Sequence, residues 1–190
     1  MVTSVALYLV FLALLYAERG IELLVSRRHA RLAFDAGGME TGRGQYRVMV
    51  AVHALFPFAC GGEVLALHRT FPGALGFAAL AAALAAQALR WWAAATLGPR
   101  WSTRIIVVPG TRPVTSGPYR YVRHPNYLAV MLEAMTVPLI HAAWLSAIVF
   151  VAANAALLSV RVPAEERAMG EEYSRAFAGL PRFVPGGRDA

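Results

Sequence analysis

The stretch Gly117-Pro118-Tyr119-Arg120-Tyr121-Val122-Arg123-His124-Pro125-Asn126-Tyr127 joins a polar part of the chain to an apolar segment, residues 128–140. Proline fixes φ and has no backbone N–H, so the two prolines indicate a turn, and Pro125 suits the first turn of a helix. The stretch therefore predicts a helix that opens at Pro125. Arg123, His124 and Tyr127 then lie at the polar mouth of an apolar span. Tyrosine and arginine are also common anchors at the headgroup level, so an interfacial anchor remains open on this pattern alone.

The composition of the chain indicates a membrane protein. Of its 190 residues, 58% are hydrophobic, and the mean hydropathy is positive, whereas about half is usual for a soluble domain. The formal net charge of +7 comes from arginines scattered among apolar segments. Because no continuous basic run is present, we expect anionic headgroups and no nucleic acid as partners. The single cysteine, Cys60, cannot form an intrachain disulfide.

Hydropathy predicts an all-α integral membrane fold with five transmembrane helices in a single domain, residues 1–190. The expected spans are residues 2–24, 46–67, 74–97, 127–140 and 144–162. The fourth is short for a crossing of roughly 20 residues, so local thinning or tilt is expected there. Pro163 is predicted to start a carboxy-terminal helix, with Glu165 and Glu166 in its first turn.

The distribution of arginine predicts the orientation. Residues 27–47, residues 98–127 and the carboxy-terminal tail are arginine-rich, whereas the two short connections hold only Arg69. The positive-inside rule then places the basic loops in the cytosol. With five spans, the amino terminus lies outside and the carboxy terminus inside.

Several polar residues are expected at one depth inside the spans. Glu133 and Asn154 are ten and eleven residues from the turn near Ala143, so we expect them to meet, with His53 and Trp91 at a similar depth. A buried carboxyl needs a reason, and Glu133 is the candidate base. The alternatives are that His53 and Asn154 satisfy neighbours in a packed bundle, that Trp91 packs or anchors, and that Glu63 is structural.

Two blocks resemble the isoprenylcysteine carboxyl methyltransferase family of membrane enzymes. The first is Gly-Pro-Tyr-x-x-x-Arg-His-Pro-x-Tyr, residues 117–127; the second comprises Arg161, Glu165-Glu166, Gly170, Tyr173, Phe183 and Pro185. The amino-terminal half resembles a bacterial branch that methylates lipidic polyketides such as alkylpyrones and alkylresorcinols. The matching residues there are Glu18-Arg19, Glu22, Ser26-Arg27, Gly38, Glu40, Tyr46, His53, Glu63 and Arg90-Trp91-Trp92.

The resemblance implies S-adenosylmethionine as the cofactor, held over the membrane by a cytosolic loop region. It assigns the cofactor's amino or ribose groups to Glu165 and Glu166, and further cofactor contacts to Tyr119, His124 and Tyr127. We assign catalysis to Glu133, His53 and Arg123, and substrate binding to Asn154, Arg161 and Trp91, with no metal. Arg161 could instead pair with Glu165, four residues on.

The expected function is O-methylation of a lipidic alkylpyrone- or alkylresorcinol-like molecule that enters from the bilayer. The expected location is the bacterial inner (cytoplasmic) membrane, with the active site cytosolic. Within the enzyme class, carboxyl methylation of an isoprenylcysteine-like acid and N-methylation of a phospholipid remain open. Other classes also remain: a nicotinamide-dependent membrane reductase and a non-catalytic membrane protein.

Overall fold

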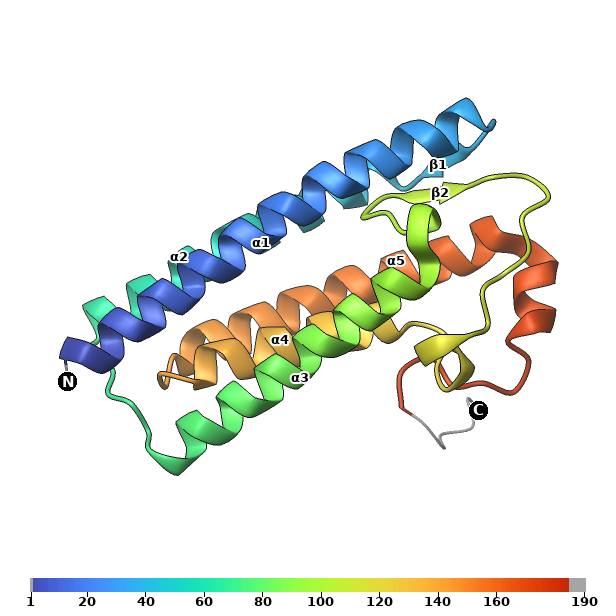
Figure 1. Cartoon of the computed structure of the whole chain (residues 1–190). Helices are drawn as coiled ribbons and strands as arrows, with labels where there is room; N and C mark the ends of the chain where they lie inside the picture. The colour runs from blue at the N-terminus through green and yellow to red at the C-terminus, as the bar shows by residue number, and fades with distance from the viewer. Residues whose placement is uncertain (1, 185–190) are drawn as a thin grey trace.

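The computed structural model describes residues 2–184 and contains five α-helices (Figure 1). They are α1 (Val2–Asp35), α2 (Arg43–Ala66), α3 (Ala74–Leu97), α4 (Pro125–Leu139) and α5 (Trp144–Ala176). The other regular elements among the described residues are short. There are two strands, β1 (Met39–Thr41) and β2 (Ile105–Val107), and two 3-10 helices, η1 (Gly98–Arg100) and η2 (Gly117–Arg120). The mostly all-α fold expected from hydropathy is confirmed.

Four helices, α1, α2, α3 and α5, are long and apolar enough to cross a membrane. The fourth in chain order, α4, has 15 residues. At 1.5 Å per residue it extends about 22 Å, less than a hydrocarbon core of roughly 30 Å. Five spans are therefore not confirmed, and the fifth crossing stays a prediction.

Two boundary predictions were wrong. The first helix continues to Asp35, so Arg27, Arg28 and Arg31 lie on a helix and not in a loop. Pro163 does not start a new helix, because α5 runs through it, as membrane helices tolerate when neighbouring groups satisfy the freed backbone. The break falls at Gly170, whose φ of 72° is readily available only to glycine.

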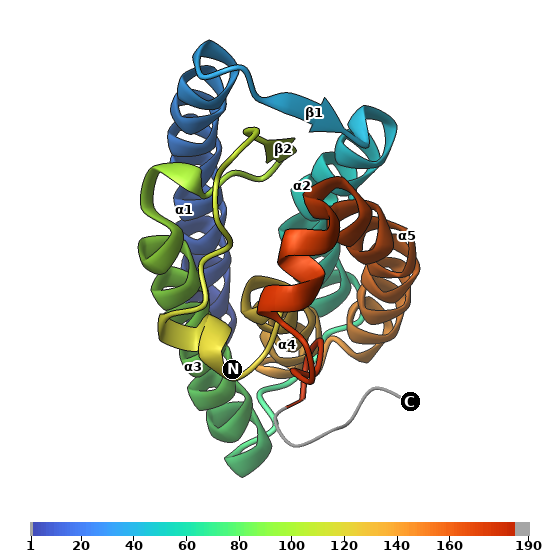
Figure 2. The ribbon, with the colours of Figure 1, turned by 90° about the vertical axis from the view of Figure 1, so that its right-hand side faces the viewer.

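The helices form a curved series in which α3 packs on α4, α4 on α5, α5 on α2, and α2 on α1 (Figures 1 and 2). Strands β1 and β2 pair antiparallel at one end of the bundle, with Glu40 opposite Ile106. This small sheet was not predicted. It ties the α1–α2 connection to the loop that follows α3.

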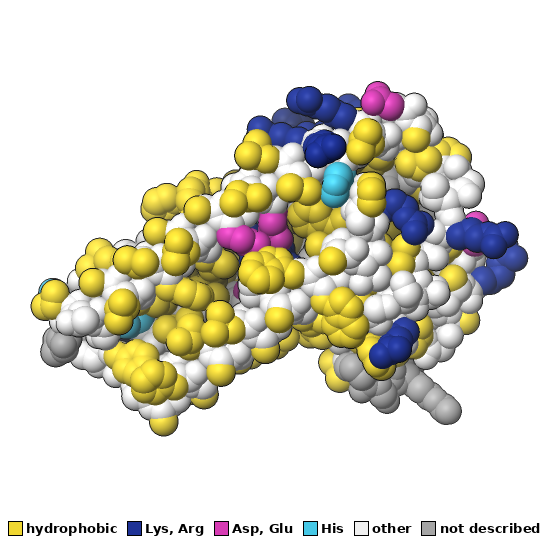
Figure 3. All heavy atoms as spheres, in the orientation of Figure 1, with side chains coloured by type: hydrophobic (Ala, Val, Ile, Leu, Met, Phe, Trp, Pro, Cys, Tyr) yellow, Lys and Arg dark blue, Asp and Glu magenta, His cyan; other side chains and the backbone are white. Residues whose placement is uncertain are grey.

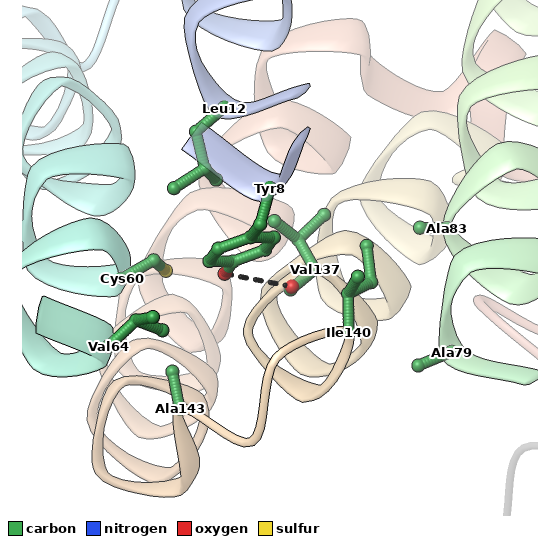
Figure 4. Close-up of a cluster of buried hydrophobic side chains, with 9 residues drawn as sticks. All are labelled: Tyr8, Leu12, Cys60, Val64, Ala79, Ala83, Val137, Ile140 and Ala143. Carbon is green, nitrogen blue, oxygen red and sulfur yellow. Dashed lines mark hydrogen bonds between the residues drawn. The ribbon is translucent and has the colours of Figure 1, made fainter. Parts of the chain in front are cut away.

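At the other end of the bundle, buried side chains from four helices and the turn before α5 form an apolar cluster (Figure 4). Its members are Tyr8, Leu12, Cys60, Val64, Ala79, Ala83, Val137, Ile140 and Ala143. The Tyr8 hydroxyl donates a hydrogen bond to the Val137 carbonyl at 3.1 Å, which satisfies the one polar group that this cluster would otherwise leave unpaired.

Glu63 has the structural role that its position suggested. Its carboxylate accepts hydrogen bonds from the Ser146 backbone N–H at 2.7 Å, the Ser146 hydroxyl at 2.8 Å and the Leu145 N–H at 3.2 Å. Arg69 adds an ion pair at 2.9 Å. An acid on α2 therefore caps the amino terminus of α5, where backbone donors have no partner inside the helix.

Candidate active site

The two sequence blocks that resemble the family meet between the start of α4 and the far part of α5. His124, directly before α4, is buried, and its Nε2 lies 3.1 Å from Glu166 Oε1. The Tyr173 hydroxyl lies 3.5 Å from the same nitrogen. The His124 ring also stacks on Tyr127, with ring centroids 5.5 Å apart. His124 and Glu166, which are 42 positions apart in the chain, thus belong to one polar group. We call this group the clamp; its members are His124, Tyr127, Glu165, Glu166 and Tyr173.

The segment after α5 folds back over the clamp. Arg182 donates to both oxygens of Glu166, at 3.1 and 2.7 Å. The backbone N–H groups of Arg123 and His124 donate to the carbonyls of Pro181 and Arg182. Hydrogen bonds from His124 and then from Arg182 lower the pKa of the Glu166 carboxyl to about 2, so this acid is charged at neutral pH.

Arg123 lies beside His124, as expected, and its catalytic role stays a prediction. Its Nε donates to the Leu180 carbonyl, and its Nη1 lies 3.7 Å from Glu166. The guanidinium thus helps to hold the segment after α5 against the clamp. Pro185, the last residue of the second block, lies outside the described residues.

Tyr127 links Arg161 and Glu165 of the second block. Its hydroxyl donates to Glu165 Oε2 and accepts from Arg161 Nε at 2.8 Å. Arg161 also donates to the Thr103 carbonyl at 2.6 Å, ahead of β2. The direct Arg161–Glu165 pair left open by the sequence is replaced by this bridge through Tyr127.

Within residues 2–184, two buried polar atoms beside the clamp have no hydrogen-bond partner: Arg161 Nη1 and Asn126 Oδ1. Orphaned buried groups are uncommon because each costs about 1–3 kcal/mol, and at functional sites they are often ligand contacts. One donor and one acceptor next to two carboxylates suit a zwitterionic, hydroxyl-bearing nucleoside cofactor. The described residues therefore fit the cofactor that the resemblance implies.

Tyr119 stands behind the clamp. It is buried with Ala93, Tyr173 and Phe177, and this burial raises the pKa of its hydroxyl above the ordinary value. Its side chain packs against Tyr173, which in turn reaches His124. Tyr119 thus supports the clamp through this cluster, and its contact with the cofactor stays a prediction.

Closer to the middle of the bundle, a hollow of about 30 Å³ lies between α1, α2, α4 and α5. Its lining includes the polar side chains of Arg19, His53, Glu133 and Asn154, together with apolar side chains such as Phe56 and Phe150. His53, Glu133 and Asn154 were expected at a similar depth, and all three side chains line this one hollow. Glu133 and Asn154 do not bond to each other, however. Asn154 donates to the Phe150 carbonyl and His53 bonds the Met49 carbonyl, each within its own helix.

Glu133 belongs instead to a cluster of charged side chains that bridges α1, α3 and α4. Arg19 donates to Glu133 Oε1 at 2.9 Å and also bonds Glu22 and Gln87. Arg90 donates two hydrogen bonds to Glu22, at 2.8 and 2.7 Å. We call this the ion cluster; its members are Glu18, Arg19, Glu22, Arg90 and Glu133.

Trp91 is not inside the hollow. Its side chain is 57% exposed, and its indole N–H donates to Glu18 Oε1 at 2.9 Å. Figure 3 shows acidic side chains at the surface between α1 and α3, surrounded by hydrophobic side chains. Part of the ion cluster therefore faces the region that lipid would occupy.

Residue spacing along each span did not identify Arg19, Glu22 and Arg90 as neighbours of Glu133, although the resemblance of the amino-terminal half included all three. The missed signal was the i, i+3 pair of Arg19 and Glu22 within an otherwise apolar helix. Among residues 2–184, no group of three or more His, Cys, Asp or Glu side chains could hold a metal ion.

The fold and the site define a helical membrane protein that carries an acid–histidine clamp at one end of the bundle and an ion cluster closer to its middle. The comparisons with known proteins identify its family. Residues 78–171 match the model of the isoprenylcysteine carboxyl methyltransferase (ICMT) family. This chain belongs to that family, whose members are membrane-embedded methyltransferases, and it is an integral membrane protein.

Two relatives align with this chain over most of their length. The uncharacterized protein YpbQ of Bacillus subtilis (strain 168) is 36% identical over 168 residues, 88% of this chain and 99% of the relative. An uncharacterized protein of Haemophilus influenzae is 27% identical over 165 residues, 86% of this chain and 95% of that protein.

Proposed function

We propose that this chain is an S-adenosylmethionine-dependent O-methyltransferase of a lipidic small molecule, such as an alkylpyrone- or alkylresorcinol-like polyketide. One observation carries the proposal: a single helix, α4, begins at the clamp and bears Glu133 of the ion cluster. Tyr127 and Glu133 are six residues apart, or about 9 Å along the helix axis. A cofactor site at the end of the bundle thus adjoins a polar site at membrane depth.

The clamp residues would hold the cofactor, which supplies an electrophilic methyl group on a sulfonium. Glu165 and Glu166 are suited to its amino and hydroxyl donors, and the unpartnered Arg161 Nη1 to an acceptor such as its carboxylate. Tyr127 orients both Glu165 and Arg161 through its hydroxyl. Phe183 beside His124, with ring centroids 6.2 Å apart, helps to exclude water from the clamp.

The acceptor would enter from the bilayer, with its polar head against the ion cluster and its chain in lipid. A phenol has a pKa near 10 and needs a base, whereas an acidic hydroxypyrone needs mainly orientation. Glu133 is the proposed base. His53, which lines the same hollow, is the proposed partner of the acceptor oxygen, and Asn154 contributes a further polar contact.

We place the active site on the cytosolic side of the bacterial inner membrane, where the cofactor is available. The arginine-rich residues on α1, in the loop after α3 and in the tail support this orientation through the positive-inside rule.

Calorimetric titration of the purified chain with S-adenosylhomocysteine tests the cofactor. We expect saturable binding that His124→Ala and Glu166→Ala weaken by at least about tenfold, since each removes a charge-assisted contact. Glu171→Ala is the matched control, because Glu171 is 93% exposed on the same helix and pairs only with Arg175 among the described residues. No heat and no protection from melting at millimolar ligand would refute the proposal.

The acceptor is tested by methyl transfer to three lipids that share one alkyl chain and differ in their heads: a resorcinol, a carboxylate and an amine. We expect the resorcinol to be methylated fastest. Preferential methylation of the carboxylate or the amine would leave the methyltransferase assignment intact and overturn the acceptor class.

A further inference from the structure

A second hollow lies at the sheet end of the molecule, apart from the clamp and the ion cluster. It has a volume of about 370 Å³. Its lining comes from the end of α1, from β1, from the first turns of α2 and from the residue before β2: Phe34, Glu40, Arg43, Tyr46, Arg47 and Arg104. None of these side chains contacts the clamp through a described interaction.

Two of its arginines are held in place by the hollow's single carboxylate. The Glu40 side chain is only 3% exposed and accepts from Arg43 Nε at 3.0 Å. It also accepts from Arg104 Nη1 at 3.3 and 3.4 Å. The Arg104 guanidinium lies over the Tyr46 ring, 5.0 Å from its centroid. Because Glu40 and Tyr46 both hold Arg104, a ligand would not bear the entropy cost of fixing this side chain.

The third arginine, Arg47, has a different status. Within residues 2–184 its guanidinium makes no described hydrogen bond or ion pair, yet it lines the hollow. Three guanidiniums face one carboxylate, so the lining carries a net charge of +2. An arginine fork binds phosphate oxygens in a bidentate manner, and the free donors of these three side chains are suited to a phosphate.

The position of the hollow along α2 indicates where that phosphate comes from. Directly after Arg47, Val48 begins the apolar part of α2 and is 54% exposed. Further exposed apolar residues, Leu55 and Phe58, follow toward the middle of the helix. Arg47 therefore lies where headgroups meet hydrocarbon, and acyl chains would lie along α2 directly beside the hollow.

We propose that this hollow binds the phosphate of an anionic phospholipid, with its acyl chains along α2. The site fixes the sheet end of the bundle to the headgroup layer and does not depend on the methyl acceptor. Free inorganic phosphate shares the same chemistry but lacks the chains that would contact Val48.

Native mass spectrometry of the full chain in detergent tests this site. The protein is equilibrated with phosphatidylglycerol and phosphatidylcholine of identical acyl chains, and the ratio of bound lipids is measured. We expect preferential retention of phosphatidylglycerol, and Arg47→Gln should lower the ratio by about fivefold. Because Arg47 has no described internal partner, this change removes a ligand contact without breaking one that the fold uses.

Arg112→Gln is the matched control, because Arg112 is exposed on the loop after β2, outside the hollow. It removes the same charge and should leave the ratio within about twofold of the unchanged chain. Equal effects of the two substitutions would show only general attraction to anionic lipid and would overturn the site. Inorganic phosphate at the same concentration as phosphatidylglycerol should displace little of the lipid, because it lacks the acyl chains; equal occupancy by the two would overturn the assignment to a phospholipid.

Discussion

The carboxylate of Glu166 should control how firmly the segment after α5 covers the clamp. Replacing Glu166 by Gln keeps the size of the side chain but removes its charge. Glu166 makes three described hydrogen bonds, two with Arg182 and one with His124. A charge-assisted hydrogen bond contributes about 1.5–3 kcal/mol, and less where a partner is exposed to solvent.

The Arg182 side chain is 44% exposed, and a glutamine oxygen can still accept one bond. We therefore expect Glu166→Gln to weaken closure of this segment by about 2 kcal/mol, a factor of roughly 30 in its opening equilibrium. The backbone N–H groups of Arg123 and His124 report on closure, because they donate to the carbonyls of Pro181 and Arg182.

Hydrogen exchange followed by mass spectrometry provides the measurement. Peptides that contain Arg123 and His124 should exchange about 30-fold faster in Glu166→Gln, whereas peptides from the middle of α3 should not change. Glu171→Gln is the control, because Glu171 is almost fully exposed. Unchanged exchange at Arg123 and His124 would refute the idea that the Glu166 contacts hold the segment closed.

The same contacts predict a dependence on pH. The pKa of the Glu166 carboxyl is lowered from 4.5 to about 2, first by the hydrogen bond with His124 and then by Arg182. A lowered pKa gives stabilisation that is present above about pH 4.5 and is lost as the pH falls toward 2. Opening of the segment on acidification from pH 5 to pH 3 should therefore be weaker in Glu166→Gln than in the unchanged chain.

Three further predictions concern the rest of the bundle. Glu63→Ala should lower the stability of the chain by about 2–3 kcal/mol in thermal melting, since it uncaps α5 and leaves Arg69 unpaired. A loss of stability equal to that of Glu171→Ala would contradict the capping role. In intact cells, Phe71→Cys should react with an impermeant external thiol reagent and Arg112→Cys should not; the reverse labelling would invert the orientation. Glu133→Gln should lower kcat on a resorcinol lipid by about 100-fold while leaving S-adenosylhomocysteine affinity unchanged, and loss of that affinity would mean that Glu133 holds the bundle together.

The long helices and the clamp could be predicted because their signals are local in the sequence. Hydropathy alone placed α3 at residues 74–97, the observed range, since Gly73 and Gly98 bound an apolar run. The clamp followed from two motifs that contain its residues. The fold then brings His124 and Glu166 to 3.1 Å, a contact that neither motif specifies by itself.

Features that depend on how one segment of the chain packs against another could not be predicted. The run Ile105–Val107 has the β-branched residues of a strand, but it is three residues long and its partner, Met39–Thr41, has no such signal, so the sequence pattern predicts a loop there. Helix α5 passes Pro163 because propensity is a weak constraint where packing decides. Arg90 is paired with Glu22 because of how α1 and α3 are rotated toward each other, which spacing within one helix does not specify.

The ion cluster also bears on how Glu133 could act as a base while it is ion-paired with Arg19. Among the described residues, hydrogen bonds reach only one of its oxygens, Oε1, which leaves Oε2 to accept from an entering hydroxyl. The cluster holds three carboxylates, Glu18, Glu22 and Glu133, but only two guanidiniums, Arg19 and Arg90, so its net charge is −1. Burying an uncompensated charge in low dielectric is costly. When Glu133 takes the acceptor's proton, the count becomes two against two, and Arg19 keeps its bonds to Glu22. Proton transfer to Glu133 therefore moves the negative charge from the cluster to the acceptor oxygen, and methyl transfer from a cationic sulfonium would then remove that charge from a depth where an isolated anion is poorly tolerated.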